Sequence, residues 1–259
     1  MFIDKDEIQL TSEFLKKGYI KKDISDIKSL RKISDITLNS INKSLKTDNT
    51  QNLLNNLHKK IKPSKLNQFR LKLHKELNDK KNFRPLYYRI AKKYLDILVG
   101  NELVMQNKVN LSIQLPKDSS SLLPLHSDTW SGDSPFEIVV WLPLVDCYRT
   151  KSMFILDPIE SKKLYKKFSK LKNSNIEKIF NNIKKKVKWI DIKYGQILIF
   201  NQSLPHGNII NQESETRVSM NCRFKSLFSP YGDKKLGEFF EPINIKAATT
   251  IGIDYKDPK

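Results

Sequence analysis

The first hundred residues carry apolar side chains at helical spacing, separated by Lys, Asp and Ser. Recurrence every three or four residues places the apolar groups along one side of a helix. Similar stripes follow Pro63 and Pro85, and proline is well tolerated in a first helical turn. A polar break falls at 46–51. We therefore expect residues 5 to about 105 to be helical. The first stripe consists of Ile24, Ile27, Leu30, Ile33, Leu38, Ile41 and Leu45.

From Val109 the period changes to two. Apolar and polar residues alternate over 109–115, which predicts a strand with one apolar and one polar face. A Lys- and Asn-rich segment, 159–186, returns to roughly helical spacing and predicts a helical insertion between strands. The tail from Ile245 carries no usable pattern. Further strands are expected at 136–142, 153–156, 187–190, 196–200 and 216–227.

Length and composition favour a folded protein of one large domain or two small ones. The chain has 259 residues, of which 39% are hydrophobic and only 8 are Gly, so collagen-like and wholly disordered classes are excluded. Neither a membrane-spanning run nor a signal-peptide pattern is found, and the two cysteines form no CxxC motif. We expect a cytoplasmic protein with reduced thiols.

The charge balance raises the question of nucleic acid. Lys and Arg total 47 against 28 Asp and Glu, for a formal net charge of +19. Only seven of those cations are arginine, the side chain that binds phosphate bidentately. Scattered lysines usually solvate a surface. Charge alone therefore makes nucleic acid the less favoured partner, without excluding it.

Three side chains in two short segments form a candidate metal site. His126 and Asp128 are separated by one residue, so on an extended chain they project to the same side. His206 follows the expected strand at 196–200 and offers a third ligand. Two histidines and one carboxylate on one face of an octahedron are the ligands of non-haem Fe(II) oxygenases. HxD alone recurs by chance, so the interpretation needs further support.

That support comes from the strand that follows His206. Arg217 and Ser219 lie on its polar face, which in most sheets simply meets solvent. Near a metal, however, a guanidinium can bind a carboxylate bidentately, with the Ser219 hydroxyl as a second donor. The polar face comprises Arg217, Ser219, Asn221 and Arg223, and the apolar face Val218, Met220, Cys222 and Phe224.

The motifs HSD, LPHGN and RVS together resemble the Fe(II)- and 2-oxoglutarate-dependent oxygenase superfamily, over roughly residues 105–228. The longer runs around them are similar to an oxygenase family of bacterial carbohydrate-biosynthesis clusters, and the helical N-terminal half is similar to phytanoyl-CoA hydroxylase-like enzymes. The resemblance implies an α+β fold, with a double-stranded β-helix core at 106–259. Residues 1–105 would pack on that core as a helical region and form one structural unit with it.

The resemblance also implies roles for individual residues. His126, Asp128 and His206 would bind Fe(II), and Arg217 with Ser219 would bind the distal carboxylate of 2-oxoglutarate. Dioxygen would take the remaining metal position. Asn110, Ser112 and Gln114 either add hydrogen bonds to the cosubstrate or face solvent and the sheet ladder. Asp128 distinguishes the chain from halogenating relatives, which lack this carboxylate.

The substrate is less well defined. The resemblance implies hydroxylation of a sugar, nucleotide-sugar or glycan intermediate, and Trp130, Asp133, Glu137 and Arg223 are the candidate substrate contacts. Trp130 could stack on a sugar ring, although tryptophan is more often core. Two alternatives stay open: an oxidative demethylase of nucleic acid with the same iron centre, and a non-catalytic cupin-like binding protein. The sequence indicates neither the oxidised carbon nor the oligomeric state.

Overall fold

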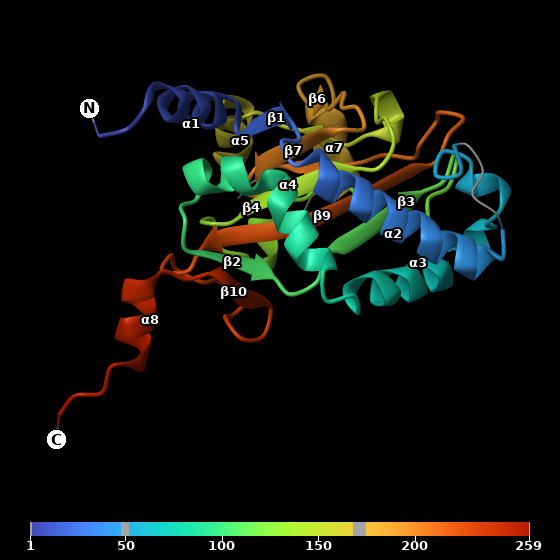
Figure 1. The fold of residues 1–259 in the computed structure, drawn as a ribbon. Coiled ribbons are helices and arrows are strands. Elements are labelled where there is room, and N and C mark those ends of the chain that lie inside the picture. The colour runs from blue at the N-terminus through green and yellow to red at the C-terminus, as the bar shows by residue number, and fades with distance from the viewer. Residues whose placement is uncertain (1, 48–51, 168–174, 259) are drawn as a thin grey trace.

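A computed structural model describes residues 2–47, 52–167 and 175–258 (Figure 1). The chain combines helices with two antiparallel sheets, as the predicted α+β class requires. The helices are α1 (Lys5–Lys17), α2 (Ile27–Leu45), α3 (Pro63–Asn78), α4 (Phe83–Leu98), α5 (Pro158–Tyr165), α7 (Ile176–Ile183) and α8 (Ala247–Asp254). The strands are β1 (Tyr19–Asp23), β2 (Leu103–Gln106), β3 (Asn110–Gln114), β4 (Ile138–Pro143), β5 (Phe154–Ile155), β6 (Lys188–Trp189), β7 (Gln196–Asn201), β8 (His206–Gly207), β9 (Arg217–Ser226) and β10 (Phe240–Asn244).

Helices α2, α3 and α4 lie across the near face of the larger sheet in Figure 1. Asp26 caps α2 by accepting hydrogen bonds from the Ser29 N–H and hydroxyl, so the helix begins three residues after the start of its apolar stripe. Tyr87 in α4 is fully buried, and its hydroxyl donates to the carbonyl of Val140 at 2.9 Å. This hydrogen bond ties the helical layer to β4 beneath it.

In both sheets, neighbouring strands run antiparallel. The larger has the order β1-β7-β4-β9-β2-β10, with β3 also paired to β9, and the smaller has the order β6-β5-β8. Strand β9 is therefore central, and its apolar face, which includes Met220 and Phe224, belongs to the main core shared with the helices. Its polar face is left to line the space between the sheets. The smaller sheet packs with α5 and α7 around a second core that contains Phe154 and Ile179.

The predicted strands from residue 109 onward are confirmed within one or two residues at each end. The expectation of helix throughout 5–105 is wrong at β1 and β2. Gly18 ends α1 at φ +74°, and β1 then pairs with β7, from Tyr19 opposite Phe200 to Asp23 opposite Gln196. This pairing joins distant parts of the chain, and local spacing does not reveal it.

The insertion and the tail complete the fold. The predicted insertion at 159–186 contains α5 and α7, while its part at 168–174 and the polar break at 48–51 lie outside the described residues. The tail forms α8, which projects from the body in Figure 1 and buries none of its residues. Over the described part of the chain, the helices are too short or too polar to cross a bilayer.

Candidate metal centre

The three predicted ligands lie together because the backbone joins two distant segments. His126 and His206 form an isolated antiparallel bridge, in which each N–H donates to the other carbonyl at 2.9 and 2.8 Å. Asp128 begins a short 3-10 turn, and its N–H donates to the Gln202 carbonyl at 3.1 Å. Ligand atoms of the three side chains lie within 4.8 Å of one another, so one metal ion could bind all three. Within the described ranges, no other His, Cys, Asp and Glu group has this property.

Both imidazoles are oriented for metal binding. Nδ1 of His126 lies 2.7 Å from the Pro124 carbonyl, and Nδ1 of His206 lies 2.8 Å from the Leu204 carbonyl. Carbonyls accept only, so each Nδ1 carries the proton and each Nε2 keeps its lone pair. The two Nε2 atoms face Oδ1 of Asp128 at 3.5 and 4.0 Å. Backbone carbonyls thus fix the tautomer in which Nε2 can bind a metal.

The electrostatics of the group differ from one ligand to the next. Burial lowers the pKa of His206 to about 4, and the nearby His126 imidazole adds to this effect. Burial also acts to lower the pKa of His126, but hydrogen bonds with Asp128 and the Pro124 carbonyl outweigh it and raise the pKa. Burial acts to raise the pKa of Asp128, yet the His126 hydrogen bond and the Arg223 charge hold it well below its usual range. His206 and Asp128 are therefore in their metal-binding states at neutral pH.

The cavity beside these ligands has a volume of about 320 Å³ and lies between the two sheets. It extends from the three ligands to Arg217, so one small molecule could contact both. The lining is His126, Asp128, His206, Gly207 and Asn208, with Asn110, Ser112, Leu123, Val139, Trp141, Met153, Phe200, Arg217, Asn221 and Arg223.

Arg217 is a buried cation without an anionic partner in the described chain. It is 3% exposed, and its guanidinium donates to the Ser152 carbonyl and the Ser112 hydroxyl, both at 3.2 Å. Among the described residues, its Nε has no hydrogen-bond partner and no carboxylate lies within ion-pair distance. A buried charge is costly unless it is paired. The position therefore favours an anionic ligand.

The other predicted cosubstrate contacts occupy two kinds of position. Asn110 lines the cavity and donates from Nδ2 to Asn221 Oδ1 at 2.9 Å. Gln114 and Ser219 are fully buried and are not among the lining residues. Gln114 Nε2 donates to the Ile209 carbonyl at 2.6 Å, while Gln114 Oε1 and Ser219 Oγ have no hydrogen-bond partner among the described residues. The contact of these two residues with a cosubstrate stays a prediction.

Solved structures with a similar fold include a non-haem monooxygenase and two further metal-bound proteins. The complex of the non-haem monooxygenase ThoJ with nickel has a TM-score of 0.60 at 13% identity, covering 93% of this chain and 85% of ThoJ. HygX from Streptomyces hygroscopicus, with nickel and 2-oxoglutarate bound, has a TM-score of 0.52 at 12% identity, covering 90% of each chain. EctD from S. alaskensis with bound iron has a TM-score of 0.52 at 14% identity, covering 90% of this chain and 82% of EctD.

The chain has the fold of these three proteins. At this level of identity the likeness concerns the fold alone, and the arrangement of His126, Asp128 and His206 is an independent observation. The sequence matches no model of a known protein family, and a search of curated proteins likewise finds no match.

The predicted substrate contacts surround the ligands in this fold. Arg223 donates from Nη2 to Asp128 Oδ2 at 2.9 Å. Asp133 is buried and forms an ion pair with Lys234 at 2.6 Å, and Glu137 is buried next to Gln202. All three side chains are thus engaged within the protein, and their contact with a substrate stays a prediction.

Trp130 lies in the turn that Asp128 begins and is half-buried. Its ring meets the Tyr165 ring of α5 edge-on, with centroids 6.3 Å apart. The insertion thus reaches the metal-binding turn, although Trp130 does not line the cavity itself.

Gln202 supports the candidate metal centre, and the sequence patterns did not predict it. It is fully buried, accepts from Arg223 Nε at 2.9 Å and donates to Glu137 Oε2 at 2.9 Å. A buried amide needs partners on both sides, and Gln202 lies four residues before His206 within the same motif. Its place directly after an apolar strand was the available signal.

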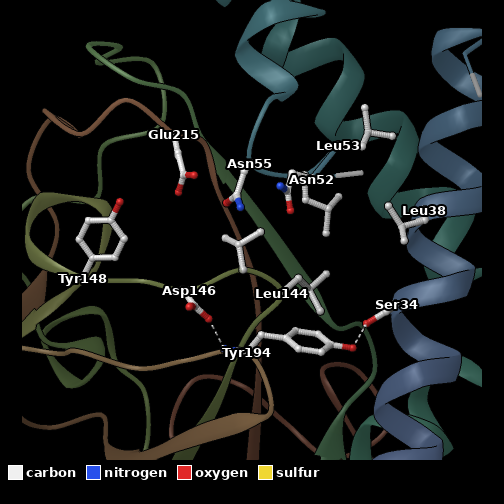
Figure 2. A pocket seen from close by; sticks show the side chains of 12 residues that line it. Ser34, Leu38, Asn52, Leu53, Asn55, Leu144, Asp146, Tyr148, Tyr194 and Glu215 are labelled. Atoms are coloured by element: carbon white, nitrogen blue, oxygen red, sulfur yellow. Dashed lines mark hydrogen bonds between the residues drawn. The ribbon is translucent and has the colours of Figure 1, made fainter. Parts of the chain in front are cut away.

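A larger hollow of about 650 Å³ lies elsewhere, between α2, residues 52–55 and the loop at 144–148 (Figure 2). The Tyr194 hydroxyl lies 2.9 Å from the Ser34 hydroxyl at one end, and Glu215 and Asn55 lie at the other. Both of these bind Nζ of the buried Lys151, at 2.6 and 2.8 Å. No group of three metal-ligating side chains is found there among the described residues.

Proposed function

We propose that this chain is a non-haem Fe(II)- and 2-oxoglutarate-dependent oxygenase with a double-stranded β-helix core, which uses dioxygen to hydroxylate a small molecule. One observation carries the proposal: three side chains that could bind one metal ion share a cavity with a buried arginine that has no carboxylate partner among the described residues. Ligands from two imidazoles and one carboxylate suit Fe(II) and leave coordination positions open.

The residues of the cavity fit both Fe(II) and 2-oxoglutarate. The two Nε2 atoms and Asp128 Oδ1 point toward a common centre, which suits a divalent ion. Arg217 Nε lacks a partner although it is fully buried, which suits a carboxylate from a ligand. A dicarboxylic 2-oxo acid would satisfy both sites at once, because one end chelates a metal and the other is an anion.

Iron, 2-oxoglutarate and dioxygen together supply oxidative decarboxylation of the cosubstrate and oxidation of a substrate C–H bond. The protein contributes orientation and exclusion of water. His126, Asp128 and His206 would hold the metal, and Arg217 would hold the far carboxylate of the cosubstrate. Apolar side chains of the lining, among them Val139 and Phe200, would limit the access of water beside the three ligands, since Val139 lies opposite Arg223 and the Phe200 ring lies 4.9 Å from the His206 ring.

The substrate would approach on the His126 side. The His126 side chain is 34% exposed, whereas the His206 side chain is 8% exposed, so solvent reaches the metal position past His126. We propose a sugar or nucleotide-linked sugar as the substrate. The support is the similarity of the segments around His126 and His206 to oxygenases of carbohydrate-biosynthesis clusters.

A succinate-release screen tests this function. Purified protein with Fe(II), 2-oxoglutarate and ascorbate is incubated with nucleotide sugars, polyols and methylated oligonucleotides, and products are identified by mass. We expect succinate release that depends on a sugar-containing substrate, with a product heavier by one oxygen atom. Succinate release stimulated only by polyols or other sugar-free compounds would contradict the sugar assignment alone. A folded protein that releases none, with or without a substrate, would contradict the oxygenase assignment.

Nucleic-acid demethylation is the second candidate, and the net charge of +19 favours it. Contact with phosphates would make binding weaken steeply with salt. Oligonucleotide binding that is salt-dependent, together with formaldehyde release from methylated bases, would move the assignment from sugars to nucleic acid.

A further inference from the structure

The two oxygens of the Asp128 carboxylate have different surroundings. Oδ1 faces the two Nε2 atoms, at 3.5 Å from His126 and 4.0 Å from His206. Oδ2 points the other way and accepts a hydrogen bond from Arg223 Nη2 at 2.9 Å. A charge-assisted hydrogen bond of this length is among the stronger kinds in proteins. One oxygen is therefore directed toward the metal position and the other is held away from it.

Arg223 is itself held in place from its other side. Its Nε donates to Gln202 Oε1 at 2.9 Å, and the Gln202 amide nitrogen donates to Glu137 Oε2 at 2.9 Å and to the Ser134 carbonyl at 3.0 Å. Because both ends of the Gln202 amide are engaged with groups of fixed polarity, the amide has one orientation. A chain of hydrogen bonds thus runs from Glu137 through Gln202 and Arg223 to Asp128.

The Phe239 ring lies on the guanidinium of Arg223, with its centroid 5.9 Å away. Asp133 lies 3.5 Å from Arg223 Nη2, but Asp133 is also paired with Lys234 at 2.6 Å. Asp133 is therefore paired mainly with Lys234, and the closest carboxylate partner of Arg223 is Asp128.

We infer that Arg223 is a positioning residue that restricts Asp128 to one-oxygen metal coordination and so keeps the positions needed by a chelating 2-oxo acid open. The inference rests on the proposed function, because it requires a metal at the triad. A carboxylate can bind a metal through one oxygen or two. A second Asp128 oxygen on the metal would occupy a position that the cosubstrate needs, and Arg223 holds that oxygen at 2.9 Å.

The test compares Arg223→Met and Arg223→Lys with a matched control, Arg84→Met. Arg84 forms an ion pair with Glu241 and contacts neither Asp128 nor Asp133. Nickel, which is not oxidised by air, replaces iron. Binding of nickel, and then of 2-oxoglutarate to the nickel-loaded protein, is measured by calorimetry, with circular dichroism as the check on folding.

We expect Arg223→Met to weaken 2-oxoglutarate binding to the nickel protein about 10- to 100-fold, by analogy with the loss of activity that follows removal of an outer partner of a metal ligand. Nickel affinity should change much less, since all three ligands remain. Arg223→Lys keeps the charge but cannot reach both Gln202 and Asp128, so its loss should be smaller. Arg84→Met should bind both as the unmodified protein does.

Crystal structures of the nickel forms give a readout that activity does not. One Asp128 oxygen should lie within about 2.2 Å of nickel in the unmodified protein, and two in Arg223→Met. One-oxygen coordination and unchanged 2-oxoglutarate affinity in the variants would overturn the inference but not the proposed function. Arg223→Lys carries the test if Arg223→Met fails to fold. Unmodified protein that binds no nickel would instead overturn the proposed function, and the inference with it.

Discussion

The larger hollow beside α2 and the smaller cavity between the sheets are lined by different kinds of side chain. In the larger one, Asp146 and Tyr194 are exposed and Glu215 already has Lys151 as its partner (Figure 2). In the smaller one, Asp128, His206 and Arg217 are buried. An unpaired polar atom costs more free energy when it is buried than when it is exposed. A polar group without a partner in the smaller cavity is therefore stronger evidence for a ligand than one in the larger hollow.

The difference shows that volume is a weak guide to chemistry in this molecule. About 650 Å³ of space accompanies side chains that solvent or the protein already satisfies. About 320 Å³ accompanies three convergent metal ligands and an arginine whose Nε has no partner. Matched substitutions in the two hollows can therefore break or sharpen the comparison.

The largest effect is expected from Asp128→Ala. Removing one of three metal ligands should lower nickel affinity and turnover by at least about 100-fold, the upper range for loss of an outer-sphere partner alone. Nickel calorimetry and succinate release provide the measurements. The same change in the larger hollow, Asp146→Ala, should leave both values unchanged. Equal losses in the two variants would remove the distinction between the hollows.

A smaller and more selective effect is expected from Arg217→Met. Hydrogen bonds to a charged group contribute about 1.5–3 kcal/mol each, so the 2-oxoglutarate concentration needed for half-maximal turnover should rise roughly 10- to 100-fold. Nickel affinity should stay unchanged, since Arg217 contacts none of the three ligands. Arg84→Met, which removes an arginine from the ion pair with Glu241, is the control. Normal cosubstrate affinity in Arg217→Met would show that the anion binds elsewhere.

Metal affinity should depend on pH through one histidine. A metal binds only the neutral imidazole, so affinity is constant above the raised pKa of His126 and falls as the pH drops through it. His206, with a pKa of about 4, stays neutral over most of that range. Nickel affinity should therefore fall about tenfold per pH unit down to about pH 5. A fall of a hundredfold per unit would mean that both imidazoles are protonated together.

The smallest effect is expected from Tyr194→Phe in the larger hollow. The change removes only the hydroxyl that pairs with Ser34, at a partly exposed position. The free energy of unfolding should fall by less than about 1.5 kcal/mol, the usual range for one hydrogen bond. Turnover and cosubstrate affinity should not change, as denaturant titration and succinate release would test. A tenfold loss of turnover would assign the larger hollow a role in the reaction.

The sequence predicted those parts of the molecule that depend on local periodicity. The alternation of β9 placed Arg217, Asn221 and Arg223 on one face, and all three line the cavity. The stripe before Leu45 predicted α2, whose start is set by the Asp26 cap. Residue types at the triad predicted ligands that the fold brings within 4.8 Å.

Features that depend on long-range pairing were not predictable in this way. Strand β1 is a strand because it adds to the edge of β7, which its own spacing does not encode. The contact between Arg223 and Asp128 requires β9 to pass beside the turn at 128–131. Ser219 shares the alternation of Arg217, yet it lies between Ser112 and Pro143 of the neighbouring strands and is absent from the cavity lining.

Anaerobic titration of the protein with Fe(II) and 2-oxoglutarate, followed by visible absorption, tests the joint site most directly. The account predicts a weak charge-transfer band that appears only when both are present and saturates at one of each per chain. A folded protein that shows no band at saturating concentrations of both would contradict the claim that the triad and Arg217 bind one metal and one 2-oxo acid together.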